Sequence, residues 1–171
     1  LILFWKGARM IPYFQNKPER LKKLHEILET WIGTPYHHMA DVKGRGVDCT
    51  KFIGLTLAEL GVFTGITKGN YYPPDWNFHG TQEVVLESFQ DHIDRYVLPQ
   101  YQILYHRFEG QELSPGDCLG FAMVGKLTNH TVWLYDESHI FHAFNKVGVH
   151  KTTFSRSWKN RLKCFWRIYD I

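Results

Sequence analysis

The first regular pattern of apolar and polar residues covers residues 16–31. Apolar side chains recur at every third or fourth position and form one stripe, which is typical of a helix with one face packed on a core. The stripe consists of Leu21, Leu24, Leu28 and Trp31. Because Asn16 and Glu19 have the spacing of a capping box, the pattern predicts a helix that begins near Asn16.

Two further helices are predicted in the same way. Apolar positions in 50–60 repeat at helical spacing, and Gly61 is the residue type that commonly stands just past a helix end. This helix places Cys49 at its N-terminus. A third helix is predicted over about 81–96. Its apolar face consists of Val85, Phe89 and Ile93.

The pattern changes after the turn signal at 114–117, where short apolar segments with hairpin-length connections predict strands. The predicted strands are 118–124, 130–135, 140–144, 149–154 and 162–169. Helices come first and strands later. We therefore expect an α+β domain in which an antiparallel sheet packs against the N-terminal helices.

Length and connectivity predict one domain at 16–171, after an N-terminal extension at 1–15. Residues 62–80 combine glycines and prolines with aromatic side chains, so we expect an ordered aromatic loop inside the domain. The apolar run that opens the chain is shorter than the core of a secretory signal, and no signal peptide is expected. No segment approaches the roughly 18–20 apolar residues of a membrane span, so none is expected.

The charge and the cysteine content exclude several classes of function. A formal net charge of +3 is too small to indicate a nucleic-acid partner, and none is expected. The three cysteines are an odd number with long separations and no Cys-x-x-Cys pair, which argues against a disulfide framework and a zinc knuckle. We expect reduced thiols.

One of these thiols is a candidate nucleophile. A thiol attacks only as its thiolate, and a helix N-terminus together with a nearby imidazolium lowers the thiol pKa by stabilising the negative charge. Cys49 has the first of these features by its position. Cys118 and Cys164 lie in apolar strand segments, where a buried and inert thiol is the usual outcome.

Two histidines are candidates for the base and its partner. His130 opens a predicted strand, and a rigid strand fixes the direction of an imidazole toward a neighbouring helix end. His142 lies in the next strand, where the two imidazoles are expected as cross-strand neighbours on one face, so that His142 orients His130. Surface or satisfied core positions are expected for His25, His92, His106, His139 and His150.

A zinc site is the alternative for the same three residues, because Cys, His and His are also zinc ligands. Spacing argues against it. Zinc sites usually draw two ligands from one short motif, whereas Cys49, His130 and His142 come from three separate elements. We expect no metal ligands.

Five stretches of the chain, taken together, resemble the NlpC-type papain-like cell-wall cysteine endopeptidases. They are WIGTPY at 31–36, GVDCTKFI at 46–53, PGD at 115–117, NHTVWLY at 129–135 and IFHA at 140–143. Their order and spacing match, and the resemblance covers about residues 21–169. It implies a papain-like core and a reaction that needs no cofactor.

The resemblance also implies residue roles. Cys49 attacks the amide carbon, His130 takes and returns the proton, and His142 fills the orienting position. Tyr36 matches a tyrosine whose hydroxyl lies near the nucleophile and the oxyanion, although a plain core aromatic is the alternative. Asp48 matches an acidic residue that meets the free amine of a peptidoglycan stem peptide, while its other candidate role is to cap the helix.

The sequence departs from the family pattern next to the cysteine, where small residues are common but Thr50 and Lys51 stand here. The Lys51 cation either helps to hold a thiolate or binds a substrate carboxylate. In the aromatic loop, Tyr72 and Trp76 are candidates for a lip over the substrate or for a docking surface.

The expected substrate is the peptidoglycan stem peptide, cleaved between γ-D-glutamyl and the diamino acid through a thioester. A short enzyme with an inserted aromatic loop most resembles the subgroup in phage tails and gene-transfer particles. This implies phage-like tail proteins as partners and a virion or particle tail as location, with synthesis in the bacterial cytoplasm and action at the cell wall. The alternatives are a papain-like amidase or acyltransferase, or a catalytically idle tail-assembly protein.

Overall fold

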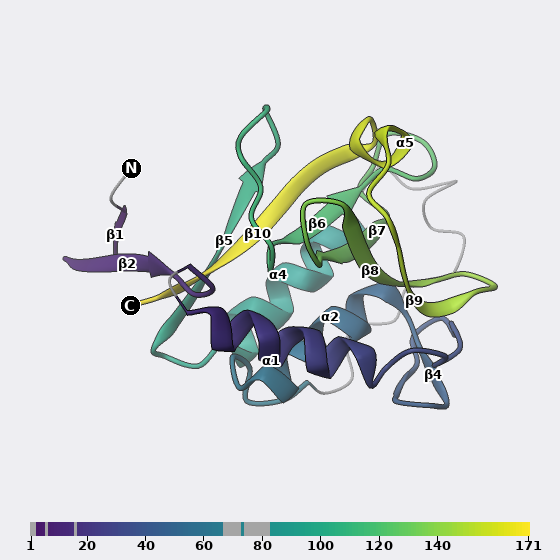
Figure 1. Ribbon diagram of the computed structural model, residues 1–171, viewed down its shortest axis with the longest axis horizontal. Coiled ribbons are helices and arrows are strands. Elements are labelled where there is room, and N and C mark those ends of the chain that lie inside the picture. The colour runs from purple at the N-terminus through teal and green to yellow at the C-terminus, as the bar shows by residue number, and fades with distance from the viewer. Residues whose placement is uncertain (1–2, 6, 16, 67–72, 74–82) are drawn as a thin grey trace.

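The computed structural model describes residues 3–5, 7–15, 17–66, 73 and 83–171 (Figure 1). Tyr72 and Trp76, the candidate substrate-binding residues of the predicted aromatic loop, lie outside the described residues. Among the described residues, no helix is both long enough and apolar enough to cross a membrane.

Helix α1, Pro18–Glu29, is shorter than the predicted helix at 16–31. Its N-cap residue is Lys17, which makes no side-chain capping hydrogen bond, and Asn16 of the predicted capping box lies outside the described residues. Pro18 at the first helical position explains the start, because its fixed φ suits a helix and its missing N–H leaves one fewer donor to satisfy. Leu24, Ile27 and Leu28 form the buried face.

Helix α2, Cys49–Leu60, confirms the second predicted helix. Asp48 caps its N-terminus, and Gly61 ends it in the left-handed conformation at φ 83°, which glycine adopts without steric cost. Most residues of α2 are buried, because the helix lies between the sheet and the two helices α1 and α4. Helix α4, Val84–Tyr96, confirms the third helix, which was predicted at about 81–96.

The described strands form an eight-stranded antiparallel sheet in the order β1-β2-β10-β6-β7-β8-β9, with β5 also paired to β10. The strands are β1 Leu3–Trp5, β2 Ala8–Pro12, β5 Tyr101–Arg107, β6 Cys118–Phe121, β7 His130–Leu134, β8 His139–Phe144, β9 Gly148–Thr153 and β10 Leu162–Asp170. A separate hairpin joins β3, Asp41–Val42, to β4, Gly46–Val47. The short helix α5, Arg156–Lys159, precedes β10.

Strands β6 to β10 confirm the five predicted strands within a few residues. The sequence missed β5, which has little apolar periodicity because Ile103 is its single fully buried residue. It also missed β2, whose Ile11 and Pro12 pair with Asp170 and Tyr169 of β10. Part of the stretch predicted as an N-terminal extension therefore belongs to the sheet.

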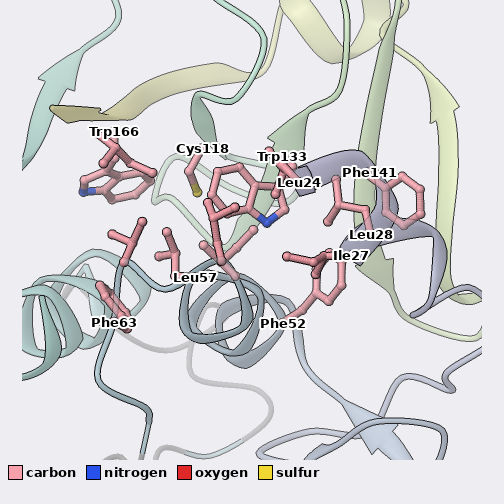
Figure 2. Close-up of a cluster of buried hydrophobic side chains, with 14 of the residues drawn as sticks. Leu24, Ile27, Leu28, Phe52, Leu57, Phe63, Cys118, Trp133, Phe141 and Trp166 are labelled. Carbon is pink, nitrogen blue, oxygen red and sulfur yellow. The ribbon is translucent and has the colours of Figure 1, made fainter. Parts of the chain in front are cut away.

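The sheet has two differently covered faces. Helices α1, α2 and α4 lie on one face, where Leu24, Phe52 and Leu57 pack against Trp133 and Trp166 (Figures 1 and 2). A second apolar cluster forms on the other face. Its fully buried members include Leu119, Phe121, Val132 and Ile140. This arrangement is the predicted α+β architecture, with the antiparallel sheet packed against the N-terminal helices.

Candidate active site

The N-terminus of α2 is built around Asp48, which is 2% exposed. One carboxylate oxygen, Oδ1, accepts a hydrogen bond of 2.7 Å from the Lys51 amide, and Oδ2 accepts one of 3.0 Å from the Met39 amide. The carboxylate therefore caps the helix and holds the preceding loop at once. Capping was one of the two roles expected of Asp48; the other, contact with a substrate amine, stays a prediction.

Cys49 is the first residue of α2 and is 6% exposed. Its Sγ lies 3.9 Å from Thr50 Oγ1 and next to Thr131 of β7. Burial and the nearby Asp48 carboxylate raise the pKa of the thiol to about 11, and its contacts with Thr131 and Thr50 lower that pKa only in part. The expectation of a lowered pKa is wrong for this resting state, because desolvation outweighs the helix terminus.

His130 and His142 lie together, as predicted. His130 Nε2 and His142 Nδ1 are 2.8 Å apart, and the ring centroids are 5.1 Å apart at 67°. The register Trp133↔Phe141, continued toward the histidines, sets His142 beside Val132, so the two imidazoles are diagonal neighbours on one face. Burial lowers the pKa of His130 to about 3 and lowers that of His142 as well, so both rings are neutral near pH 7.

The structure brings His130 to His142 but does not hydrogen-bond either ring to the thiol. Side chains alternate along β7, and Trp133 points to the helix face, where its Nε1 donates to Thr56 Oγ1 at 2.8 Å. Thr131 shares that face and meets Cys49, whereas His130 points to the other face. Among the described residues, no hydrogen bond links Cys49 Sγ to an imidazole.

The thiol and the imidazole pair are connected through one residue of β7, because Thr131, which contacts Cys49, directly follows His130 in the chain. The recorded pairing of β7 with β8 covers only Trp133↔Phe141 and Leu134↔Ile140, so the strands separate before they reach the histidines. Hydrogen bonds between catalytic groups are often long without substrate and tighten when it binds.

Two residues beside the imidazole pair were missed by sequence reasoning. Trp158 of α5 lies edge-on to His142, with centroids 5.1 Å apart, and covers the pair from solvent. His150 of β9 lies directly opposite His142, with ring centroids 4.5 Å apart. His150 is half-buried and its Nδ1 donates to the Gly148 carbonyl, which fits the expected surface or satisfied core position, and it also contacts the imidazole pair. The hairpin register of β8 and β9 is the signal that could have found it.

The other predicted site residues are placed as follows. Tyr36 is partly buried, and burial, with Cys49 and Asp48 nearby, raises the pKa of its phenol. Its role beside the nucleophile stays a prediction. Burial raises the pKa of Asp48 and lowers that of His92. The Lys51 cation, 4% exposed, acts on both groups and lowers both pKa values, so it lies near the N-terminus of α2 and near α4. Its role toward substrate stays a prediction.

No metal site is found in the described part of the chain, where no group of three or more His, Cys, Asp or Glu side chains is arranged to hold an ion. Cys118 and Cys164 are free and buried. Burial raises the pKa of the Cys118 thiol and raises that of Cys164 to about 12. Both thiols are therefore neutral, as expected of inert core cysteines.

No protein-family model and no curated protein sequence matches the chain. Among solved structures, it is similar to a Staphylococcus aureus protein described as similar to lipoprotein, NLP/P60 family, with 15% identity and a TM-score of 0.58 over 94% of this chain. It is also similar to NlpC2 from Trichomonas vaginalis, with 12% identity and a TM-score of 0.54 over 95%. The chain spans 45% and 51% of those two proteins, about half of each. The chain thus has the α+β, papain-like fold of the NlpC/P60 proteins.

Proposed function

We propose that this protein is a cysteine hydrolase that cleaves amide bonds in peptidoglycan stem peptides, between γ-D-glutamyl and the diamino acid. The observation that carries the proposal is the buried hydrogen bond of 2.8 Å between His130 Nε2 and His142 Nδ1. His130 opens β7, and the next residue of that strand, Thr131, contacts Cys49 at the N-terminus of α2. A nucleophile, a base and an orienting group are what acyl transfer to a thiol requires.

The hydrogen bond occupies His130 Nε2, so Nδ1 is the His130 nitrogen that remains to act as the base. If His130 Nε2 donates its proton to His142 Nδ1, the lone pair of a neutral His130 is on Nδ1. Nδ1 takes the thiol proton as Cys49 Sγ bonds to the amide carbon, and then gives that proton to the leaving amine as the carbon–nitrogen bond breaks. Water attacks the resulting thioester by the same route, which releases the carboxylic acid and restores the thiol.

The start of α2 stabilises the charges that form in this reaction. The first amides of a helix have no partner inside it, and the helix dipole is positive at this end. The N–H groups of Cys49 and Thr50 therefore favour both the thiolate and the oxyanion, and the Tyr36 hydroxyl is the third donor nearby. Because burial keeps the thiol neutral at rest, proton transfer to His130 accompanies the attack.

The wall substrate is supported by the sequence resemblance and by the similarity of the fold to NLP/P60 family structures. Both Asp48 oxygens already accept backbone hydrogen bonds, so an amine of the substrate would share the carboxylate with the Lys51 and Met39 amides. The location on a phage-like particle rests on the sequence resemblance alone.

A second candidate function is a protein that keeps this fold for docking and does not catalyse. One observation favours it: among the described residues, the Cys49 thiol has no hydrogen bond to an imidazole. The hydrolase explains more, because a docking fold has no need for two bonded, buried imidazoles in a strand that also contacts a thiol at a helix N-terminus.

The test uses purified sacculi and stem peptides of defined sequence, with release of new amine groups and mass spectrometry of the fragments as readouts. Wild-type protein should release amines, and Cys49→Ala should release none. Cys118→Ala and Cys164→Ala are matched controls that remove a buried thiol away from the helix start, and they should keep most of the activity. Equal hydrolysis by Cys49→Ala and wild type would reject the proposal, and no hydrolysis by correctly folded wild type would favour the docking protein.

A further inference from the structure

A cavity lies on the face of the sheet opposite the helices, and its volume is about 280 Å³. The described residues that line it include no residue of the candidate active site. Its apolar walls belong to the second apolar cluster or pack against it. They are Phe108, Leu113, Leu134, Phe154 and Leu162. Ligand sites start at about 300 Å³, so a cavity of this size suits one small molecule.

Two side chains of opposite charge line the same cavity. They are Lys159 of α5 and Glu137, which lies in the turn between β7 and β8, and both are exposed. The Lys159 ammonium lies 5.2 Å from the centre of the Phe154 ring, which is one wall of the cavity. In the described part of the chain, neither Lys159 nor Glu137 forms a salt bridge with the other or with a third side chain. Both charges can therefore pair with a ligand.

The third polar residue at the cavity, Gln111, is already engaged. Its Oε1 accepts a hydrogen bond of 2.6 Å from the Glu109 amide, and its Nε2 donates one of 3.0 Å to the Arg107 carbonyl. The Gln111 amide thus holds the loop after β5. Recognition in this cavity therefore depends on apolar walls, one cation and one anion.

We propose that this cavity binds an apolar amino acid in its zwitterionic form. The ligand carboxylate pairs with Lys159, the ligand ammonium pairs with Glu137, and the apolar side chain fills the space between the apolar walls. A fatty acid satisfies only Lys159, and an apolar amine satisfies only Glu137. The inference does not depend on hydrolysis, because the cavity and the Cys49 thiol lie on opposite faces of the sheet.

NMR titration of the full chain tests charge and shape separately with four probes. They are phenylalanine, N-acetylphenylalanine, which lacks the ammonium, phenylalaninamide, which lacks the carboxylate, and alanine, which has both charges but little apolar surface. An exposed ion pair contributes up to about fivefold in affinity, and burial of the ring contributes more. Phenylalanine should therefore bind about fivefold more tightly than either single-charge probe and more tightly still than alanine. Its binding should shift the amide signals of Leu134, Phe154 and Lys159.

Charge variants should change the probes in opposite ways. Lys159→Met should weaken phenylalanine and N-acetylphenylalanine by about fivefold and leave phenylalaninamide unchanged. Glu137→Gln should weaken phenylalanine and phenylalaninamide by about the same factor and leave N-acetylphenylalanine unchanged. Lys163→Met and Glu112→Gln are matched controls, because they remove exposed charges that do not line the cavity. They should change phenylalanine binding by less than about twofold.

Equal binding of phenylalanine by wild type, Lys159→Met and Glu137→Gln would overturn the inference, as would no binding at the cavity. Octanoate, an apolar anion without an ammonium, should bind more weakly than phenylalanine. Tighter binding of octanoate would identify an acyl chain as the occupant and would also overturn the inference. Cys49→Ala should bind phenylalanine as wild type does, whether or not the protein hydrolyses wall peptides, so this inference and the proposed function can fail separately.

Discussion

The two halves of the candidate site lie on opposite faces of one strand. On the helix face of β7, Thr131 packs against Cys49, whose thiol burial makes neutral with a pKa of about 11. On the other face, His130 is hydrogen-bonded to the buried His142, and burial lowers the His130 pKa to about 3. Burial shifts the two groups in opposite directions, because it disfavours whichever form is charged.

For the proposed hydrolase, this comparison describes a resting site whose two halves are not yet in contact. A thiolate and an imidazolium stabilise each other only when they are close, and here each half is desolvated separately. The positive end of α2 and the His130–His142 bond are both in place, so what substrate has to bring about is the contact between thiol and imidazole. Changes on either face should therefore have distinct and separable effects.

The largest expected effect is on turnover and comes from the imidazole side. His130→Ala removes the base, and general-base catalysis contributes about 10²–10⁴-fold, so hydrolysis of stem peptides should fall by that factor. His142→Asn should keep part of the activity, since its amide oxygen still accepts from His130 Nε2–H. Steady-state kinetics check both, and equal, total loss in the two variants would contradict the division into base and orienting residue.

The second effect is on stability. The imidazole half should lose stability in acid and the thiol half in alkali. The pKa of His130 falls from 6.5 to about 3 on folding. Its contribution to the free energy of unfolding is therefore complete above pH 6.5 and is lost as the pH falls toward 3. At pH 5 this costs about 2 kcal/mol for each such imidazole. The Cys49 pKa rises from 9.0 to about 11, so its contribution is lost as the pH rises through that range, about 1.4 kcal/mol at pH 10.

Denaturant unfolding at pH 5, 7 and 10 measures both losses. A double variant with His130→Gln and His142→Asn should lose less stability between pH 7 and 5 than wild type does. Cys49→Ala should lose less between pH 7 and 10. An acid loss of the same size in the double variant would show that other groups cause it.

The third effect is on the reactivity of the thiol. Because the Cys49 pKa is about 11 rather than 9.0, the folded protein holds about a hundredfold less thiolate at neutral pH than an unperturbed cysteine. Iodoacetamide should therefore label Cys49 slowly in the unliganded protein, with a rate that rises with pH up to about 11. Mass spectrometry of labelled peptides measures this rate, and fast labelling at pH 7 would mean that an imidazolium already reaches the thiol.

The smallest effect concerns the cap on the thiol side. Asp48→Asn keeps one oxygen acceptor but sets an amide N–H₂ against the other backbone donor, so it should destabilise the fold by about 1–3 kcal/mol. Asp94→Asn is the control on the exposed side of α4 and should change stability by less than about 0.5 kcal/mol in denaturant unfolding.

The sequence determined the elements whose signals are local. The period of Ile53, Leu57 and Leu60, with Gly61 after them, determined α2 and so placed Cys49 at a helix N-terminus. Period-two strands placed His130 and His142 on one face. The sequence missed β2 and β5, whose pairing with β10 depends on contacts far apart in the chain and leaves little apolar pattern.

Only the tertiary structure decided how the halves of the site relate to each other. Which face of β7 meets α2 depends on packing of Trp133 against Thr56, and a shift of one residue would exchange the positions of His130 and Thr131. The pKa values depend on desolvation, which comes from all elements around the site and not from its motifs. Likewise, His150 lies beside His142 because of the register between β8 and β9, which its neighbours in the sequence do not reveal.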